Sequence, residues 1–301
     1  MFTRLNSSRC QNQFPSALLL LTFLLLLATF QAPGAVEATE EREKFFIGQF
    51  QSERFSMKEP NYFLFGFARD NTLPRPVPVS DQVRFKVSIQ YLAIGKPGYP
   101  NGLFGAFTQD TFWNIYDKSA PIYDTNFIPE LFFRHGFVRE QKNKSWNDIT
   151  GLRFGVRHHS NGRDEYDSRS WNRIFGTAEW GNHQKSQLYA SASLWHVWSE
   201  GGESHDTYKY LGRGELRVDF KPLWKFNYKD LATMGMSLRV PILGRQIIPA
   251  VELALYVGLI KKSSEYFAPS VMIQYYDGYG YTLLDYKQHV RAIRVGFATV
   301  R

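Results

Sequence analysis

The sequence predicts an all-β protein, a transmembrane antiparallel β-barrel of about 12 strands. Apolar and polar residues alternate strictly along several segments, charged residues fall on the polar side of that alternation, and 16% of the residues are aromatic. Strict alternation is typical of strands that have one apolar and one polar face. In a membrane barrel the apolar face contacts lipid and the polar face lines the lumen.

The N-terminal segment has the features of a secretory signal. Two arginines precede an apolar run from Ala17 to Phe30, and small residues follow up to Ala38. A basic start, an apolar core and small residues at its end are typical of a cleaved signal peptide. A retained signal anchor needs roughly 18 or more apolar residues, and this run is shorter. We therefore expect residues 1–38 to be removed and residues 39–301 to form a single barrel domain.

Charge and cysteine content restrict the partners of the chain. It carries 36 Lys and Arg against 28 Asp and Glu, a net charge of +8, and these charges are scattered without a basic block. A nucleic-acid partner is therefore not expected. The one cysteine, Cys10, precedes the apolar run. The exported chain would then contain no disulfide, and its stability must come from burial and backbone pairing.

The alternation is clearest in four segments, at 83–91, 213–220, 234–240 and 251–257. A secreted β-sandwich shows the same pattern with its apolar face turned inward. Mixed runs of Arg and Glu on one strand face, and aromatic residues near the strand ends, favour the barrel. The aromatic residues expected at the membrane interfaces are Trp113, Trp180, Trp195, Trp198, Tyr275, Tyr276, Tyr279 and Tyr281.

The segment 151–173 places reactive side chains on the apolar face of a strand. On an extended chain one face would carry Leu152, Phe154, Val156, His158 and Ser160, and the other Arg153, Arg157 and His159. An imidazole and a hydroxyl would then lie side by side toward lipid. A nucleophile in that position makes little sense for a dissolved substrate, but it suits a lipid.

The next strand, beginning near Ser168, supplies a third group. A short turn through 163–167 would bring Asn172 beside His158, which gives a nucleophile, a base and an orienting amide. Spacing alone leaves alternatives open. These residues could be ordinary surface groups, and Asn161-Gly162 could be a hairpin turn. A His158–His159 metal pair is less favoured, because adjacent strand residues point to opposite faces.

The same residues carry a family resemblance. The run His158-His-Ser160-Asn161-Gly162-Arg163, followed by Ser168-Arg169-Ser170-Trp171-Asn172-Arg173, closely resembles the signature of the bacterial outer membrane phospholipase A family. Further matches lie at 108–109, 125–132, 209–212 and 278–286. The resemblance covers nearly the whole chain after the signal segment, in the expected order.

The resemblance implies a 12-stranded barrel in the outer membrane that hydrolyses acyl esters of phospholipids and lysophospholipids, a phospholipase of A1/A2 type. By position in the motif, Ser160 matches the nucleophile, His158 the general base and Asn172 the third triad member. Gly162 matches the residue whose backbone N–H helps to hold the oxyanion.

The resemblance also implies a Ca²⁺ cofactor and an active homodimer. The calcium ligands of the family match Arg163 and Ser168 in one subunit and Ser119 in the other. Arg163 could serve only through its backbone carbonyl, because a guanidinium repels the ion. Glu165 and Glu203 fall roughly where other members place acids for a second calcium mode.

Two functions of other classes are compatible with the alternation alone. The first is a non-catalytic outer-membrane channel or structural barrel, and the second is a secreted esterase on a β-sandwich. A channel needs no His, Ser and Asn on its lipid face, whereas the enzyme needs all three there.

Overall fold

A computed structural model describes residues 54–70, 77–79, 83–97, 99, 101–137, 149–181, 188–225, 233–258 and 269–299. The predicted signal peptide and its cleavage position near Ala38 lie outside this range, so the expected domain boundary stays a prediction. Within these residues no helix is long and apolar enough to cross a membrane.

Strands make up most of the described chain. They are β1 (Phe55–Met57), β2 (Asn61–Asp70), β3 (Val77–Val79), β4 (Val83–Gly95), β5 (Gly102–Trp113), β6 (Ile122–Gly136), β7 (Ile149–Ser160), β8 (Arg169–Trp180), β9 (Leu188–Gly202), β10 (Gly214–Lys225), β11 (Thr233–Ile242), β12 (Ala250–Gly258), β13 (Pro269–Gly278) and β14 (Val290–Thr299). Two short helical turns, η2 (Glu165–Asp167) and α3 (Thr207–Leu211), lie in loops.

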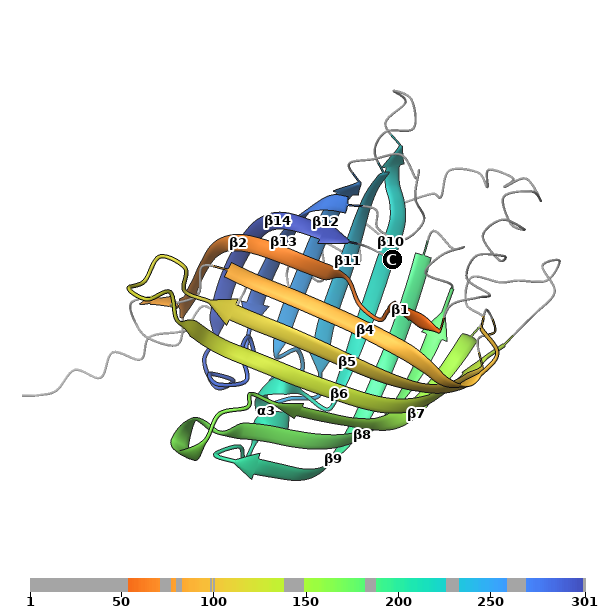
Figure 1. Ribbon diagram of the computed structural model, residues 1–301, viewed down its shortest axis with the longest axis horizontal. Helices are drawn as coiled ribbons and strands as arrows, with labels where there is room; N and C mark the ends of the chain where they lie inside the picture. The colour runs from red at the N-terminus through yellow and green to blue at the C-terminus, as the bar shows by residue number, and fades with distance from the viewer. Residues whose placement is uncertain are drawn as a thin grey trace, which may run out of the picture. The chain divides into compact units, whose positions relative to one another are not determined.

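The strands form a closed antiparallel ring. From β4 to β14 each strand pairs with the next along the chain, β14 pairs with β2, and β2 pairs with β4 (Figure 1). The ring therefore contains twelve strands, while β1 pairs with the far part of β4 and β3 forms a hairpin with β2. The predicted barrel is confirmed, and the β-sandwich is wrong because pairing of β2 with β4 closes the sheet on itself.

Side chains alternate between the two faces as the sequence predicts. In β4 the apolar residues Val87 and Ile89 are exposed on the outside, while Arg84, Lys86 and Ser88 are buried on the lumen side. An apolar outer face and a charged interior are the pattern of a transmembrane barrel. On the outer face, lipid therefore covers the apolar side chains that a soluble protein would bury in its core.

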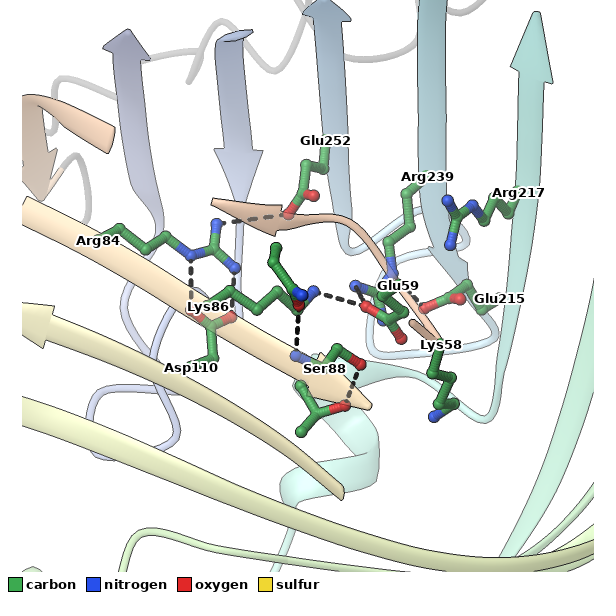
Figure 2. A network of polar contacts seen from close by, with 12 residues as sticks. Lys58, Glu59, Arg84, Lys86, Ser88, Asp110, Glu215, Arg217, Arg239 and Glu252 are labelled. Carbon is green, nitrogen blue, oxygen red and sulfur yellow. Dashed lines mark hydrogen bonds and ion pairs between the residues drawn. The ribbon is translucent and has the colours of Figure 1, made fainter. Parts of the chain in front are cut away.

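A network of ion pairs joins lumen-facing side chains of β4, β5, β10, β11 and β12 to residues 58 and 59, between β1 and β2 (Figure 2). Two of its acids are held close to their partners. Arg84 donates to both carboxylate oxygens of Asp110, at 3.0 and 2.7 Å, and Lys86 donates to Glu59 at 2.6 Å. Further pairs inside the barrel are Arg239–Glu215, Arg239–Glu59, Arg217–Asp219, Arg84–Glu252, Lys58–Glu130 and Arg157–Glu130. These pairs cross the interior from one strand to another, which is more typical of a braced lumen than of an open pore.

The expectation that aromatic residues near the strand ends face the membrane interface is wrong for three of them. Trp195, Tyr276 and Tyr281 are only 9%, 7% and 4% exposed and pack in internal clusters. Trp195 pairs with the lumen-facing Phe175, and Tyr281 belongs to a loop that folds inward. The face of the strand, rather than nearness to its end, decides where an aromatic residue lies. Trp198, at 47% exposure, does face outward.

Because neighbouring strands are antiparallel, successive connections lie at alternate ends of the barrel. The connection 161–168 between β7 and β8 shares its end with the connections 114–121, 203–213 and 279–289. In the 279–289 connection, Tyr281, Leu283 and Tyr286 are buried. It therefore covers the barrel interior at the end where the motif residues lie.

Candidate active site

The outer face of β7 leads directly to the motif. Leu152, Phe154 and Val156 are exposed, Phe154 at 65%, whereas Gly151 and Gly155 on the other face are buried. His158 and Ser160 continue the outward row and are half-buried. The predicted orientation of this strand is confirmed by these exposures.

Asn172 lies opposite His158 on the neighbouring strand. In the β7–β8 register His158 pairs with Asn172 and Ser160 pairs with Ser170. The His158 ring Nδ1 lies 2.7 Å from Asn172 Oδ1. An amide oxygen only accepts, so Nδ1 carries the hydrogen and Nε2 is left as the basic nitrogen of the neutral ring. This arrangement suits a general base.

Ser160 completes the row at the end of β7. Its strand neighbours are Ser170 on β8 and Phe127 on β6. Among the described residues no hydrogen bond joins the Ser160 hydroxyl to the His158 ring. Catalytic hydrogen bonds are often long without substrate and tighten in the complex. The two groups share one face, two residues apart on one strand.

The loop after Ser160 is held by Asn161, which is buried. The Asn161 side chain donates from Nδ2 to the carbonyl of Asp167 at 2.8 Å, and its Oδ1 accepts from the backbone N–H of Arg169 at 2.9 Å. Its backbone N–H also donates to the Arg169 carbonyl. The two ends of the loop are therefore tied together by one residue. This is no two-residue hairpin, because six residues separate Asn161 from Ser168.

Gly162 occupies a position that requires glycine. Its φ of +66° lies in the left-handed region, which is unfavourable for residues with a Cβ. A Cβ added there would lie 2.9 Å from Cε2 of Phe127. The backbone at Gly162 therefore approaches the Phe127 ring closely, and this approach fixes the direction of the chain just after Ser160.

Two of the three residues matched to calcium ligands share this loop. The Arg163 guanidinium donates to the carbonyl of Tyr123 and, at 3.3 Å, to Asp167. Ser168 is half-buried, and its carbonyl accepts from the backbone N–H of Glu203 at 2.9 Å. Ser119 is exposed in the β5–β6 connection at the same end of the barrel. No cluster of three or more His, Cys, Asp or Glu that could hold a metal occurs in the described parts of the chain.

His159 faces the lumen, as the alternation predicts. Its Nε2 lies 3.0 Å from Asn126 Oδ1, and its Nδ1 accepts from the Trp171 indole N–H at 3.0 Å. Both ring nitrogens are used within the barrel. His158 and His159 therefore cannot bind one metal ion together, since they lie on opposite sides of the barrel wall.

The loops at this end brace one another. The Tyr123 hydroxyl donates to Asp285, and the backbone N–H of Leu284 donates to Asp124 at 3.1 Å. Near α3 the Tyr286 hydroxyl donates to Asp206 at 2.6 Å. Burial alone would raise the pKa of Asp206, but the hydrogen bonds from Tyr286 and the nearby Lys287 hold it below its usual range. The 279–289 loop is thus tied to β6, where the carbonyl of Tyr123 accepts a hydrogen bond from Arg163.

The sequence interpretation missed two residues of the site. Asn161 could be found only as a turn signal, whereas its side chain closes the loop. Ser199, on β9, accepts a hydrogen bond from Asn172 Nδ2 at 2.9 Å. No motif includes Ser199, and the irregular pairing that brings it to Asn172 leaves no signal in the alternation.

Known proteins resemble this chain in sequence. The family model described as Phospholipase A1 matches residues 48–299. Phospholipase A1 of Escherichia coli strain K12 is 29% identical over 222 residues, which cover 72% of this chain and 68% of the relative. The family-model match spans the strands and loops that carry the motif residues.

Solved structures share the fold. The outer membrane phospholipase A of Escherichia coli, also solved as an asparagine-to-alanine active-site mutant, aligns with a TM-score of 0.66 at 20% identity over 84% of this chain and 96% of that one. A Salmonella typhi outer membrane phospholipase dimer with bound calcium aligns with the same TM-score and identity over 87% and 98%. The chain belongs to the phospholipase A1 family and is an outer-membrane β-barrel enzyme that hydrolyses phospholipid esters.

Proposed function

We propose that this enzyme is a calcium-dependent phospholipase that uses Ser160, His158 and Asn172 as a catalytic triad on the lipid-facing side of the barrel. The observation that carries the proposal is the 2.7 Å contact between His158 Nδ1 and Asn172 Oδ1 on the outer face, beside Ser160. A site facing outward between exposed apolar side chains receives a substrate that lies in the membrane. The active-site asparagine of the Escherichia coli protein supports the same assignment for Asn172.

The chemistry follows from the ring geometry. His158 Nε2 removes the proton of the Ser160 hydroxyl as Oγ attacks the carbonyl carbon of an acyl ester. The tetrahedral intermediate collapses, the ester bond breaks, and the lysophospholipid alkoxide leaves with the proton from His158. Water then attacks the acyl-Ser160 ester with His158 again as the base, which releases the fatty acid and restores Ser160.

Asn172 and Gly162 support these steps without exchanging protons. The Asn172 oxygen keeps the hydrogen on Nδ1 and orients the ring, as a carboxylate does in other triads. The Gly162 backbone N–H is the proposed donor to the oxyanion. The left-handed backbone and the close Phe127 ring hold this peptide in one direction, as a preorganised donor requires.

Calcium is the proposed cofactor, and the residues present fit a hard cation. The Arg163 carbonyl and Ser168 hydroxyl offer oxygen ligands, the kind that Ca²⁺ prefers. The Arg163 guanidinium is engaged by Tyr123 and Asp167, so its charge is held by other groups. When bound, calcium would stabilise negative charge near the oxyanion as a Lewis acid.

Dimerisation is proposed to complete the calcium site. Only two of the matched ligands lie in the 161–168 loop, and the third, Ser119, is exposed in another loop where it can reach a second subunit. The Salmonella typhi structure, a dimer with bound calcium, supports this arrangement. Association would also cover the apolar outer face on either side of the triad and form a groove for acyl chains.

The test is hydrolysis of a mixed-chain phospholipid by the purified enzyme in detergent, with calcium and with a chelator. We expect fatty acid release only with calcium, and the acyl chain released identifies the preferred ester. A sulfonyl fluoride should label Ser160 and stop the reaction. Equal turnover in chelator would refute the calcium proposal, and labelling elsewhere with full inhibition would refute the nucleophile.

A further inference from the structure

Ser199 reaches the triad through an irregularity in the β8–β9 pairing. Arg173 pairs with Val197, but its neighbour Asn172 pairs with Ser199, so Trp198 is an extra residue on β9. This is a β-bulge, which inserts one residue on one strand and commonly re-aims side chains next to active sites.

The bulge changes the chemistry that Asn172 meets. Leu194, His196 and Trp198 are exposed in alternation along β9, and Ser199 directly after them is exposed as well. With regular pairing the residue opposite Asn172 would be Trp198, whose indole can only donate a hydrogen bond. Because of the extra residue, the Ser199 hydroxyl lies opposite Asn172 in place of the Trp198 indole, and a hydroxyl can accept a hydrogen bond from an amide.

The Asn172 side chain is consequently held at both ends. Its Oδ1 lies 2.7 Å from His158 Nδ1, and its Nδ2 donates to Ser199 Oγ at 2.9 Å. Two anchors on a planar amide restrict its rotation, and the amide in turn fixes the imidazole. On a lipid-facing surface little water is present to replace a lost partner, so the Nδ2 group would be left unpaired without Ser199.

We infer that Ser199 is a positioning residue for the hydrolysis, acting on His158 through Asn172 rather than on the substrate. The inference rests on the proposed triad. It adds a fourth member from a third strand, so that β7, β8 and β9 each contribute one part of a row His158–Asn172–Ser199.

Ser199→Thr and Ser199→Val provide a matched pair, because the two side chains have nearly the same shape and only threonine keeps the hydroxyl. We expect Ser199→Val to lower kcat about tenfold, with the apparent KM changed less than about twofold, and Ser199→Thr to remain near the parent enzyme. Ser193→Ala is the control, since it removes a similar cross-strand contact with Thr177 on the same strand pair, away from the triad. Heat-modifiable migration in gels confirms that each barrel has folded.

The decisive measurement repeats the pair in an Asn172→Ala background. If Ser199 acts through Asn172, the valine and threonine variants should then have the same kcat, because the group that Ser199 positions is absent. Equal kcat of the two variants in the parent enzyme overturns the inference. So does a tenfold loss that persists without Asn172. If Asn172→Ala alone leaves kcat unchanged, the triad proposal itself fails, which is a distinct result.

Discussion

His158 and His159 are neighbours in the sequence and lie on opposite sides of the barrel wall. His158 faces outward, and the one hydrogen bond of its ring within the described chain is to Asn172. His159 faces the lumen, where Asn126 and Trp171 occupy both ring nitrogens. One ring keeps a nitrogen free for proton transfer, and the other has none to spare.

The comparison extends to the two faces as a whole. On the lumen side many charged groups form ion pairs, as Arg153 does with Glu179 at 3.0 Å and Arg157 with Glu130 at 3.0 Å. On the outer side the polar groups of the site stand among exposed apolar residues. Buried ion pairs hold a structure in place and are costly to break. Polar groups that are bonded only to one another at a lipid-facing surface are characteristic of a functional site.

The largest expected effect separates the two histidines. His158→Ala and Ser160→Ala should each lower kcat by at least about 10⁴-fold and leave the barrel folded, because each removes a group that takes part in bond making. His159→Ala should instead reduce stability, since it leaves the Trp171 indole N–H and the Asn126 side chain without their partner, at about 1–3 kcal/mol for each. Turnover assays and urea unfolding in detergent measure the two effects.

A loss of activity in folded His159→Ala that equals the loss in His158→Ala would break the distinction between the faces. Near-parent turnover of Ser160→Ala would show that the nucleophile lies elsewhere. Asn126→Ala serves as a control for the lumen side, because it removes a partner of His159 without touching the outer face.

Gly162 in the 161–168 loop and Gly176 on β8 extend the comparison to the backbone. Gly162→Ala introduces a Cβ at positive φ and 2.9 Å from the Phe127 ring, so it should turn the proposed oxyanion donor and reduce kcat roughly 10²-fold. Gly176→Ala is the matched control. Gly176 is exposed on β8, and a Cβ there meets no atom within 4 Å. Equal kcat for both variants would exclude Gly162 as a contributor to catalysis.

A smaller effect is expected at Ser119. If calcium takes ligands from two subunits, then calcium binding and dimerisation strengthen each other by the same factor. Ser119→Ala removes one oxygen ligand and should weaken the calcium-dependent dimer about tenfold, with a parallel loss of activity. Analytical ultracentrifugation in detergent, with calcium and with chelator, measures the equilibrium. A dimer indifferent to calcium and to Ser119 would refute the shared site and leave the triad unaffected.

The alternation of side chains was sufficient to predict the barrel and the two faces of β7. It also predicts that Asn172 lies beside His158, because a short loop between adjacent antiparallel strands fixes their register to within a residue or two. Trp195 and Tyr276 differ from the prediction because the face of the strand, and not the distance from its end, determines whether a side chain points into the lumen.

Other features depend on contacts that periodicity does not encode. The bulge at Trp198 shifts the register by one residue and brings Ser199 to Asn172. The inward fold of the 279–289 loop depends on packing of Leu283 against the cluster that contains Trp171 and Trp195. The bulge and the inward fold of the loop both result from tertiary packing, so the pattern of a single strand does not predict them.

The smallest effect on turnover is expected from cysteines that report which face of the barrel wall a side chain occupies. Fluorescent labels on cysteines introduced at Leu152 and Phe154 should be quenched by probes dissolved in the lipid phase, because these side chains are exposed between apolar neighbours. A label on a cysteine introduced at Thr177, which is buried on the lumen side beside Ser193, should be protected from quenching by the same probes. Removal of the predicted signal segment also removes Cys10, so no background thiol remains.

Since none of the three positions contacts the triad, kcat should stay within about twofold of the parent, so any change in quenching reports orientation alone. Protection at 152 and 154 together with quenching at 177 would reverse the two faces, and with them the argument that the substrate arrives from the membrane.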